Sequence, residues 1–185
     1  MRDVEIVTER LRLRPVRSED RDVVTALGAD ERVMAWLGGS LTAERSEAWL
    51  EKHVRQWREH GLGPFAVDRN GVIAGFVGLS RADFDAGIVP GIEVGWRFVF
   101  AHWGKGYATE AARAVIGDAF ERLGLAEVVA ATTPGNTRSR RVMERLEMVY
   151  SPSDTFEHPR VPEGDALRTH VVYRVTRNAW IAGRR

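Results

Sequence analysis

The sequence contains no cysteine, and this absence excludes disulfide bonds, thiol nucleophiles and cysteine metal sites. It also lacks any run approaching the roughly 20 apolar residues that a membrane helix needs, and its first residues, MRDVEIVTERLRLRP, contain no apolar signal core. An excess of charge of one sign is missing too, because 27 Lys and Arg against 26 Asp and Glu leave a net charge of +1. Bulk charge therefore gives no indication of a nucleic-acid or membrane partner. Together these absences favour a cytoplasmic protein.

What is present is typical of a globular chain with a core of its own. The 185 residues are 44% hydrophobic and 29% charged, and this length is sufficient to bury a sizeable core. No internal repeat, low-complexity segment or linker interrupts the sequence. We therefore expect one domain over residues 1–185.

The spacing of apolar residues predicts a mixed α/β arrangement. Strands are expected where apolar and polar residues alternate or a short apolar run occurs, and helices where apolar residues recur every three or four positions. The strands expected in this way lie at 10–16, 64–82 (two strands joined at Asn70-Gly71, a strong hairpin signal), 91–100, 126–132 and 167–175. The expected helices lie at 18–28, 43–60, 107–123 and 136–148.

A glycine loop, WGKGYATEA at 103–111, joins one of these strands to a helix. Gly104 and Gly106 have no Cβ, so the loop can turn tightly and a ligand can touch the main chain. The first N–H groups of the helix have no internal partners, and the helix end adds roughly half a positive charge. Val99 and Thr109 exclude the P-loop and dinucleotide patterns, which need glycine at these positions. The loop therefore suits a diphosphate, and a turn that only connects strand and helix is the alternative.

Four motifs, TERLRLRP, EVGWRF, WGKGYATEA and NTRSRRVMERL, occur in an order and spacing that resembles the GNAT N-acetyltransferase superfamily. The closest resemblance is to its ribosomal-protein N-terminal acetyltransferase branch, and it runs from Thr8 to Val175. It implies a GNAT-like α/β fold, with a mixed, mostly antiparallel sheet of about seven strands that is splayed between the fourth and fifth and flanked by helices. It also implies an acetyl-CoA-dependent enzyme that is a monomer or a homodimer.

The resemblance implies that the loop amides hold the pyrophosphate of acetyl-CoA. Gly106 and Ala108 match the end of the family pattern Q/R-x-x-G-x-G/A, whereas Trp103 takes the Gln/Arg position, as is usual in this branch. Pantetheine is then expected to pair with the backbone of the strand that ends at 98–100, with Asn136 on the opposite lip of the splay. The expected cofactor-binding residues are Phe98, Val99, Phe100, Gly104, Lys105, Gly106, Tyr107, Ala108, Thr109, Asn136 and Ser139. The basic residues Arg138, Arg140, Arg141 and Arg145 either favour the 3′-phosphate or form a solvated helix face.

Two residues are candidates for catalysis. Glu93 is the expected base, because the family commonly has an acidic residue in this strand, and the alternative is an ion pair with Arg97, the second residue after it on the same face and four positions along the chain. The family often uses a Tyr as acid seven residues after the Asn, but Met143 stands there. Ser139, one turn after Asn136, is the expected substitute, and the alternative is a hydroxyl that caps its own helix. The five histidines show no metal spacing, so no metal is expected.

The acceptor is less well defined by the sequence. A protein α-amine is favoured, and a small-molecule amine such as a polyamine or an antibiotic, or a non-catalytic CoA-binding scaffold, remain as alternatives. Trp36 is expected to line the acceptor site. A mildly acidic rim is expected from two loops, and ordinary solvated charge is the other interpretation of the same residues. The acidic residues concerned are Asp83, Asp85, Asp154, Glu157, Glu163 and Asp165.

Overall fold

The computed structural model describes residues 4–81 and 91–183. Eight strands form one mixed sheet in the order β1-β2-β3-β4-β5-β6-β8-β7, one strand more than the seven expected. Neighbouring strands are antiparallel except β5 and β6, which run parallel. The strands are β1 (Ile6–Val7), β2 (Arg12–Pro15), β3 (Pro64–Arg69), β4 (Val72–Arg81), β5 (Ile92–Phe98), β6 (Glu127–Thr132), β7 (Val149–Glu157) and β8 (Thr169–Thr176).

The helices follow the predicted periodicity closely. They are α1 (Arg21–Ala29), α2 (Glu31–Met34), α3 (Ala43–His60), α4 (Tyr107–Glu121), α5 (Thr137–Arg145) and α6 (Arg177–Ala182), with short 3₁₀ turns at Ser18–Asp20 and Phe100–His102. α3 begins where the Thr42 hydroxyl accepts a hydrogen bond from the Arg45 N–H, and it ends at Gly61, whose φ is 64°. The predicted hairpin is confirmed, because Asn70 and Gly71 both adopt positive φ between β3 and β4.

Four elements were not expected from the sequence: β1, β7, α2 and α6. β7 contains Pro152, and its pairing with β8 shifts register between Ser151 and Phe156. These interruptions remove the regular alternation by which a strand is recognised. The strand expected over 91–100 also ends earlier, at Phe98, because the chain turns into the 3₁₀ segment that follows.

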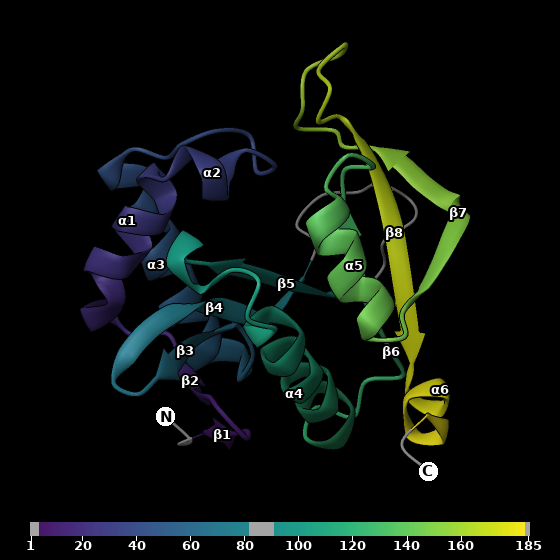
Figure 1. Cartoon of the computed structure of the whole chain (residues 1–185), viewed down its shortest axis with the longest axis horizontal. Coiled ribbons are helices and arrows are strands. Elements are labelled where there is room, and N and C mark those ends of the chain that lie inside the picture. The colour runs from purple at the N-terminus through teal and green to yellow at the C-terminus, as the bar shows by residue number, and fades with distance from the viewer. Residues whose placement is uncertain (1–3, 82–90, 184–185) are drawn as a thin grey trace.

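The predicted splay lies between β5 and β6, which are the fourth and fifth of the strands foreseen. β5 pairs with β4 along its whole length, whereas its described pairing with β6 is confined to Glu93 opposite Val129. α4 packs against β4 and β5, and α5 contacts α4 and β6. α4 therefore lies over β4 and β5, and α5 lies beside it over β6 (Figure 1).

The hydrophobic core holds these layers together. The buried stripe of α4, including Ala111, Val115 and Ile116, has no exposed surface and joins buried residues of the sheet in one cluster. Because this stripe fixes α4 against β4 and β5, it also fixes the glycine loop at the start of the helix. Among residues 4–81 and 91–183, no helix is long and apolar enough to cross a membrane.

Candidate active site

The glycine loop leaves the main chain open at the start of α4. Gly104 and Gly106 have φ values of 74° and 79°, a region that residues with a Cβ rarely adopt. Gly106 is the N-cap of α4 and has no side chain to accept the first helical N–H groups. A Cβ at Gly104 would meet no atom within 4 Å. These N–H groups and the open space beside them fit an anionic ligand.

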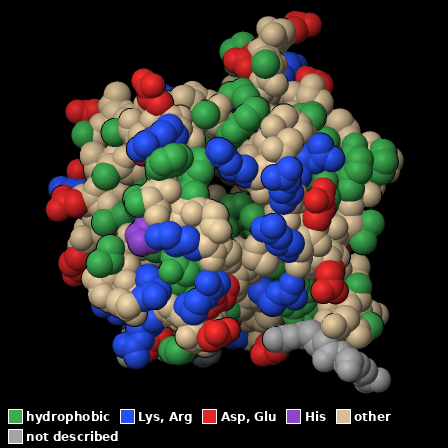
Figure 2. All heavy atoms as spheres, viewed as in Figure 1, with side chains coloured by type: hydrophobic (Ala, Val, Ile, Leu, Met, Phe, Trp, Pro, Cys, Tyr) green, Lys and Arg blue, Asp and Glu red, His purple; other side chains and the backbone are tan. Residues whose placement is uncertain are grey.

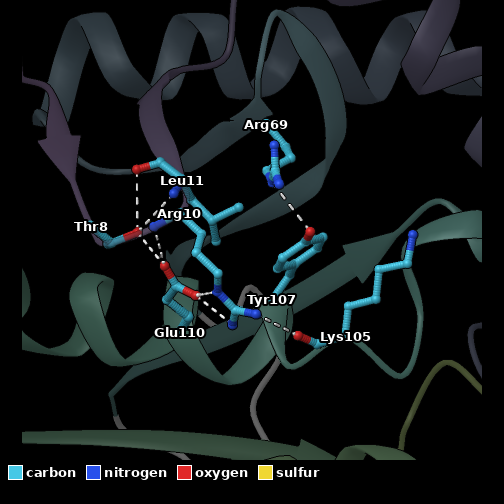
Figure 3. Close-up of polar contacts among 7 residues, drawn as sticks. All are labelled: Thr8, Arg10, Leu11, Arg69, Lys105, Tyr107 and Glu110. Carbon is cyan, nitrogen blue, oxygen red and sulfur yellow. Dashed lines mark hydrogen bonds and ion pairs between the residues drawn. The ribbon is translucent and has the colours of Figure 1, made fainter.

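The loop is held in place by the N-terminal segment of the chain (Figure 3). The Glu110 carboxylate accepts hydrogen bonds from the Thr8 hydroxyl (2.6 Å), the Arg10 N–H (2.9 Å) and the Arg10 Nε (2.7 Å). The Arg10 guanidinium also donates to the carbonyl of Lys105 inside the loop (3.0 Å) and lies 4.9 Å from the centre of the Tyr107 ring. Desolvation acts to raise the pKa of Glu110, but the bonds from Thr8 and Arg10 prevail and lower it. An ionised Glu110 thus ties the loop to Arg10.

The opposite lip of the splay is built around Asn136. Its side chain accepts a hydrogen bond from the Ser139 N–H (3.3 Å) and so caps α5. The same amide donates to the hydroxyls of Thr132 (2.9 Å) and Ser139 (3.1 Å). Because the Ser139 oxygen is an acceptor in this bond, its own hydrogen remains available for donation.

Two cavities meet at this lip. The larger, of about 390 Å³, is lined by the glycine loop and by residues of α5, and the smaller, of about 230 Å³, is lined by Glu93 and residues of β4. Five residues line both cavities: Leu37, Trp96, Arg97, Asn136 and Ser139. The splay between β5 and β6 therefore opens into a bipartite site, with Ser139 at the junction of its two halves.

Glu93 is the carboxylate of the smaller cavity. Burial raises its pKa to about 7, although a hydrogen bond from the Ala131 backbone acts in the opposite direction. The alternative role foreseen for it, an ion pair with Arg97, does not occur among the described residues. The Arg97 guanidinium instead donates to the sulfur of Met34 (3.6 Å) and lies 5.1 Å from the Trp49 ring centre. A carboxyl group with a pKa near neutrality is suited to proton transfer.

The larger cavity is basic. Arg138, Arg141 and Arg145 of α5 line it, and none of the described residues that line it is acidic. Arg140 does not line it and donates to the Tyr173 hydroxyl (3.1 Å). Figure 2 shows basic side chains around the hollow at the centre of this face. The chemistry of this cavity thus fits a phosphate-bearing ligand.

The structure does not bring every predicted cofactor residue to the cavities. Phe98 and the loop residues Gly104, Gly106, Tyr107, Ala108 and Thr109 line the larger one, whereas Val99, Phe100 and Lys105 do not. The backbone at 98–100 is already engaged, because the Phe98 carbonyl accepts from Trp103 Nε1 (2.8 Å) and the Val99 carbonyl accepts from the His102 N–H (2.8 Å). Any added-strand pairing would therefore have to use β5 before Phe98.

The predicted acceptor residues also divide. Trp36 lines the larger cavity rather than the smaller one. Asp154 and Glu157 lie on β7, line neither cavity, and form ion pairs with Arg174 (2.5 Å) and Arg168 (3.2 Å). Glu163 and Asp165 line neither cavity, and Asp83 and Asp85 lie outside the described residues. An acidic rim is thus not part of the described site.

Sequence reasoning missed the roles of Thr8, Arg10 and Glu110, although all three stand in the motifs TERLRLRP and WGKGYATEA. Their pairing joins positions about 100 residues apart. The recurrence of opposite charges in two separate motifs was the available signal, but it does not identify which charges meet. The same applies to Arg97, whose lack of an acidic partner appears only in three dimensions.

Comparison with known proteins agrees with this geometry. Residues 10–149 match the model of an acetyltransferase (GNAT) domain. The FsC-acetyl coenzyme A-N(2)-transacetylase of Aspergillus fumigatus is 30% identical over 94% of this chain and 77% of its own length. An acetyltransferase structure from Agrobacterium tumefaciens is 28% identical and superposes with a TM-score of 0.78 over 96% of both chains.

A further neighbour shares the fold at lower identity. It is Mycobacterium smegmatis RimJ, solved in complex with CoA-disulfide, with 19% identity and a TM-score of 0.74 over 91% of this chain and 82% of that one. The family match covers most of the chain, and it confirms the resemblance found in the sequence motifs. The chain belongs to the GNAT family of acetyl-CoA-dependent N-acetyltransferases.

Proposed function

We propose that this enzyme transfers the acetyl group of acetyl-CoA to a primary amine, and that its favoured acceptor is the α-amine at a peptide or protein N-terminus. One observation carries the proposal: the basic cavity at the glycine loop and the smaller cavity containing Glu93 share a wall at Asn136 and Ser139. A thioester held in the first and an amine held in the second meet at this wall. Holding both partners in one site lowers the entropic barrier to direct transfer.

The larger cavity is assigned to the CoA moiety, which supplies an activated thioester. The N–H groups after Gly106 bind the diphosphate, and Arg138, Arg141 and Arg145 add positive charge around it. The wall formed by 96–98 accommodates the pantetheine arm before the backbone turns away. Coenzyme A appears in the name of the Aspergillus relative, and RimJ was solved in complex with CoA-disulfide. Both support this assignment.

Glu93 acts as the general base, directly or through a water molecule. An α-amine with a pKa near 7.7–8.0 needs only about 1–1.4 kcal/mol to lose its proton at pH 7, whereas a lysine-type amine needs roughly 4.6 kcal/mol. A carboxyl group with a pKa of about 7 is half ionised at neutral pH and meets the smaller demand. The modest strength of this base is the reason to favour an α-amine.

Ser139 acts as the proton donor to the departing sulfur. Its oxygen accepts a hydrogen bond from Asn136 (3.1 Å), and such a bond strengthens the hydroxyl as a donor through mutual polarisation. Its place on both cavity walls puts the hydroxyl at the junction where the acetyl group changes partner. Ser139 thereby takes the role of the missing Tyr at Met143.

A panel of acceptors tests the proposal. Free thiol release from acetyl-CoA is followed with peptides bearing free N-termini, with the same peptides blocked at the N-terminus but carrying lysine, and with polyamines and aminoglycosides. We expect release with free N-termini and little with the blocked lysine peptides at pH 7. Release with small amines alone would favour the second candidate, a small-molecule acetyltransferase, which the N(2) acceptor in the name of the Aspergillus relative supports.

A further inference from the structure

The Arg97 guanidinium is the one partly buried arginine side chain of the described residues that donates to no oxygen atom. It donates a hydrogen bond to the Met34 sulfur (3.6 Å), a weak acceptor, and it lies over the Trp49 ring, 5.1 Å from the ring centre. Seven other arginines are partly buried: Arg14, Arg69, Arg113, Arg140, Arg168, Arg174 and Arg177. Each of these donates to at least one carboxylate, hydroxyl or carbonyl oxygen. Arg97 thus has N–H donors without an oxygen acceptor, whereas each of the seven other partly buried arginines has at least one such acceptor.

This arrangement is unfavourable for the protein by itself. A partly desolvated cation without an anionic partner loses hydration and gains no ion pair in return. The loss of hydration also lowers the pKa of Arg97. The guanidinium keeps its charge because its ordinary pKa lies far above neutrality. A group that is retained at this cost in an active site is explained by a ligand that completes it.

The position of Arg97 identifies which ligand this is. It lines both cavities, and its contacts to Met34 and Trp49 place it beside α2 and α3 rather than beside the glycine loop. Among residues 4–81 and 91–183, Glu93 is the one acidic residue that lines either cavity, and it does not pair with Arg97. The two residues share a face of β5 and stand four positions apart, about 13 Å along the strand. Both side chains line the smaller cavity, and its volume of about 230 Å³ suits a small molecule or a terminal residue that contacts both.

We propose that Arg97 binds a carboxylate on the acceptor, so that the enzyme acetylates amines that carry a carboxylate close to the reacting nitrogen. This inference rests on the proposed function, because it assumes that the amine is deprotonated at Glu93. The carboxylate belongs either to a free amino acid or to an acidic side chain at the first residue of a peptide. A planar guanidinium binds either one through two parallel N–H donors.

The test uses thiol release from acetyl-CoA with two matched pairs of acceptors. The first pair consists of two peptides that differ only in having Asp or Asn as the first residue. The second pair consists of a free amino acid and its amide. The members of each pair are compared at equal concentrations of the neutral amine. Hydrogen bonds to charged groups lead us to expect a preference of about tenfold or more in kcat/KM for the carboxylate member of at least one pair. The pair that shows the preference identifies the source of the carboxylate.

Variants then assign the preference to the side chain. Arg97→Gln is expected to bring the ratio within a pair close to one, because kcat/KM falls more for the carboxylate member than for the neutral member, and Arg97→Lys is expected to keep part of the preference. The matched control is Arg122→Gln. Arg122 pairs with Asp118 of α4 and lines neither cavity, so its replacement should leave the ratio unchanged.

Three outcomes would overturn the inference: equal rates for both members of each pair in the unmodified enzyme, a preference for the neutral members, or an unchanged ratio in Arg97→Gln. If Arg97→Gln fails to fold, the ratios of the unmodified enzyme and of Arg97→Lys decide the question. Thiol release without any carboxylate preference overturns this inference alone, whereas an absence of release with every amine overturns the proposed function as well.

Discussion

At the scale of single residues, the site keeps side chains in states that a stable fold would avoid. Glu93 is the clearest case, because burial without an ion pair raises its pKa to about 7. A carboxyl group whose folded pKa lies above its ordinary value of 4.5 is bound to its proton more tightly in the folded state. Between pH 4.5 and 7 the unfolded state therefore binds fewer protons, and stability falls as the pH rises through this window.

Replacing Glu93 with Gln is expected to separate stability from catalysis. The amide cannot ionise, so Glu93→Gln should be more stable than the unmodified enzyme at pH 8, by up to about 3 kcal/mol. The two proteins should differ little near pH 4, where the carboxyl is protonated in both states. Turnover should fall by about 10²-fold or more if Glu93 is the base. Denaturant unfolding at both pH values and initial rates measure these effects, and equal stability at pH 8 would contradict the burial argument.

Ser139 is expected to affect turnover rather than binding. Ser139→Ala removes a donor that acts only as the sulfur departs, so kcat should fall by about 10- to 100-fold while affinity for acetyl-CoA changes less than twofold. Thr137→Ala is a suitable control, because this exposed position lies in the same first turn of α5 and lines neither cavity. Calorimetric titration and steady-state rates distinguish the two parameters. An unchanged kcat would reduce Ser139 to a helix residue capped by Asn136.

At the scale of elements, the cofactor site is a helix end positioned by two other parts of the chain. The apolar stripe of α4 fixes the helix on β4 and β5, and the bonds from Thr8 and Arg10 to Glu110 hold its first turn toward the N-terminal segment. The loop therefore does not need to order itself when a ligand arrives, and less of the binding energy is spent on ordering.

The glycine loop can be tested against an equivalent glycine elsewhere. Gly106→Ala and Gly71→Ala introduce the same methyl group at nearly the same φ, 79° and 83°, and so should destabilise the fold by a similar amount, about 1–2 kcal/mol. Gly106→Ala should also weaken acetyl-CoA binding by about tenfold or more, because the added methyl group hinders the approach of the diphosphate to the main-chain N–H groups. The loss of one hydrogen bond to an anion has an effect of this size. Gly71→Ala, in the β3–β4 hairpin, should bind normally. Titration calorimetry on both folded variants measures the difference, and equal affinities would remove the loop from the phosphate site.

At the scale of the whole molecule, local signals predicted most of the fold, and long-range partners were beyond their reach. Asn70-Gly71 determined a hairpin because turn geometry depends on adjacent residues, and Gly61 ended α3 for the same reason. In contrast, the bonds that join Thr8 and Arg10 to Glu110 connect positions about 100 residues apart, and no local signal predicts them. β1 and β7 were missed for another reason, since β1 has only two residues and β7 contains Pro152 and a register shift.

The same division applies to the candidate site. The residues of the glycine loop are close together in sequence, and so are Asn136 and Ser139. The structure brings both groups to one cavity. Asp154 and Glu157 of the expected acidic rim line neither cavity and instead pair with Arg174 of β8 and with Arg168 just before it. Loop charges that look free in a sequence are often neutralised by residues that only the fold brings near.

The distribution of charge across the molecule leads to a final prediction, on the route by which acetyl-CoA binds. The chain is nearly neutral, yet in the part of it that the structure describes, the larger cavity is lined by arginines and by no acidic residue. This local field attracts an anionic ligand, and salt screens it over about 8 Å at physiological ionic strength. Affinity for acetyl-CoA should therefore fall as salt is added. Arg138→Gln combined with Arg141→Gln should weaken binding by roughly 2- to 30-fold, since exposed charge pairs contribute roughly 0.2–1 kcal/mol each.

A second double variant separates this local field from net charge. Arg12→Gln with Arg21→Gln also removes two positive charges, but from residues that pair with Glu5 and Glu47 and line neither cavity. This protein should keep both the affinity and the salt dependence of the unmodified enzyme in titrations at several salt concentrations. Equal weakening in the two double variants would mean that total charge governs encounter, and the arginines of α5 would then be an ordinary solvated helix face. Weakening confined to Arg138 and Arg141 places the attraction at the mouth of the cavity, where a charge that the molecule as a whole lacks is concentrated around one ligand.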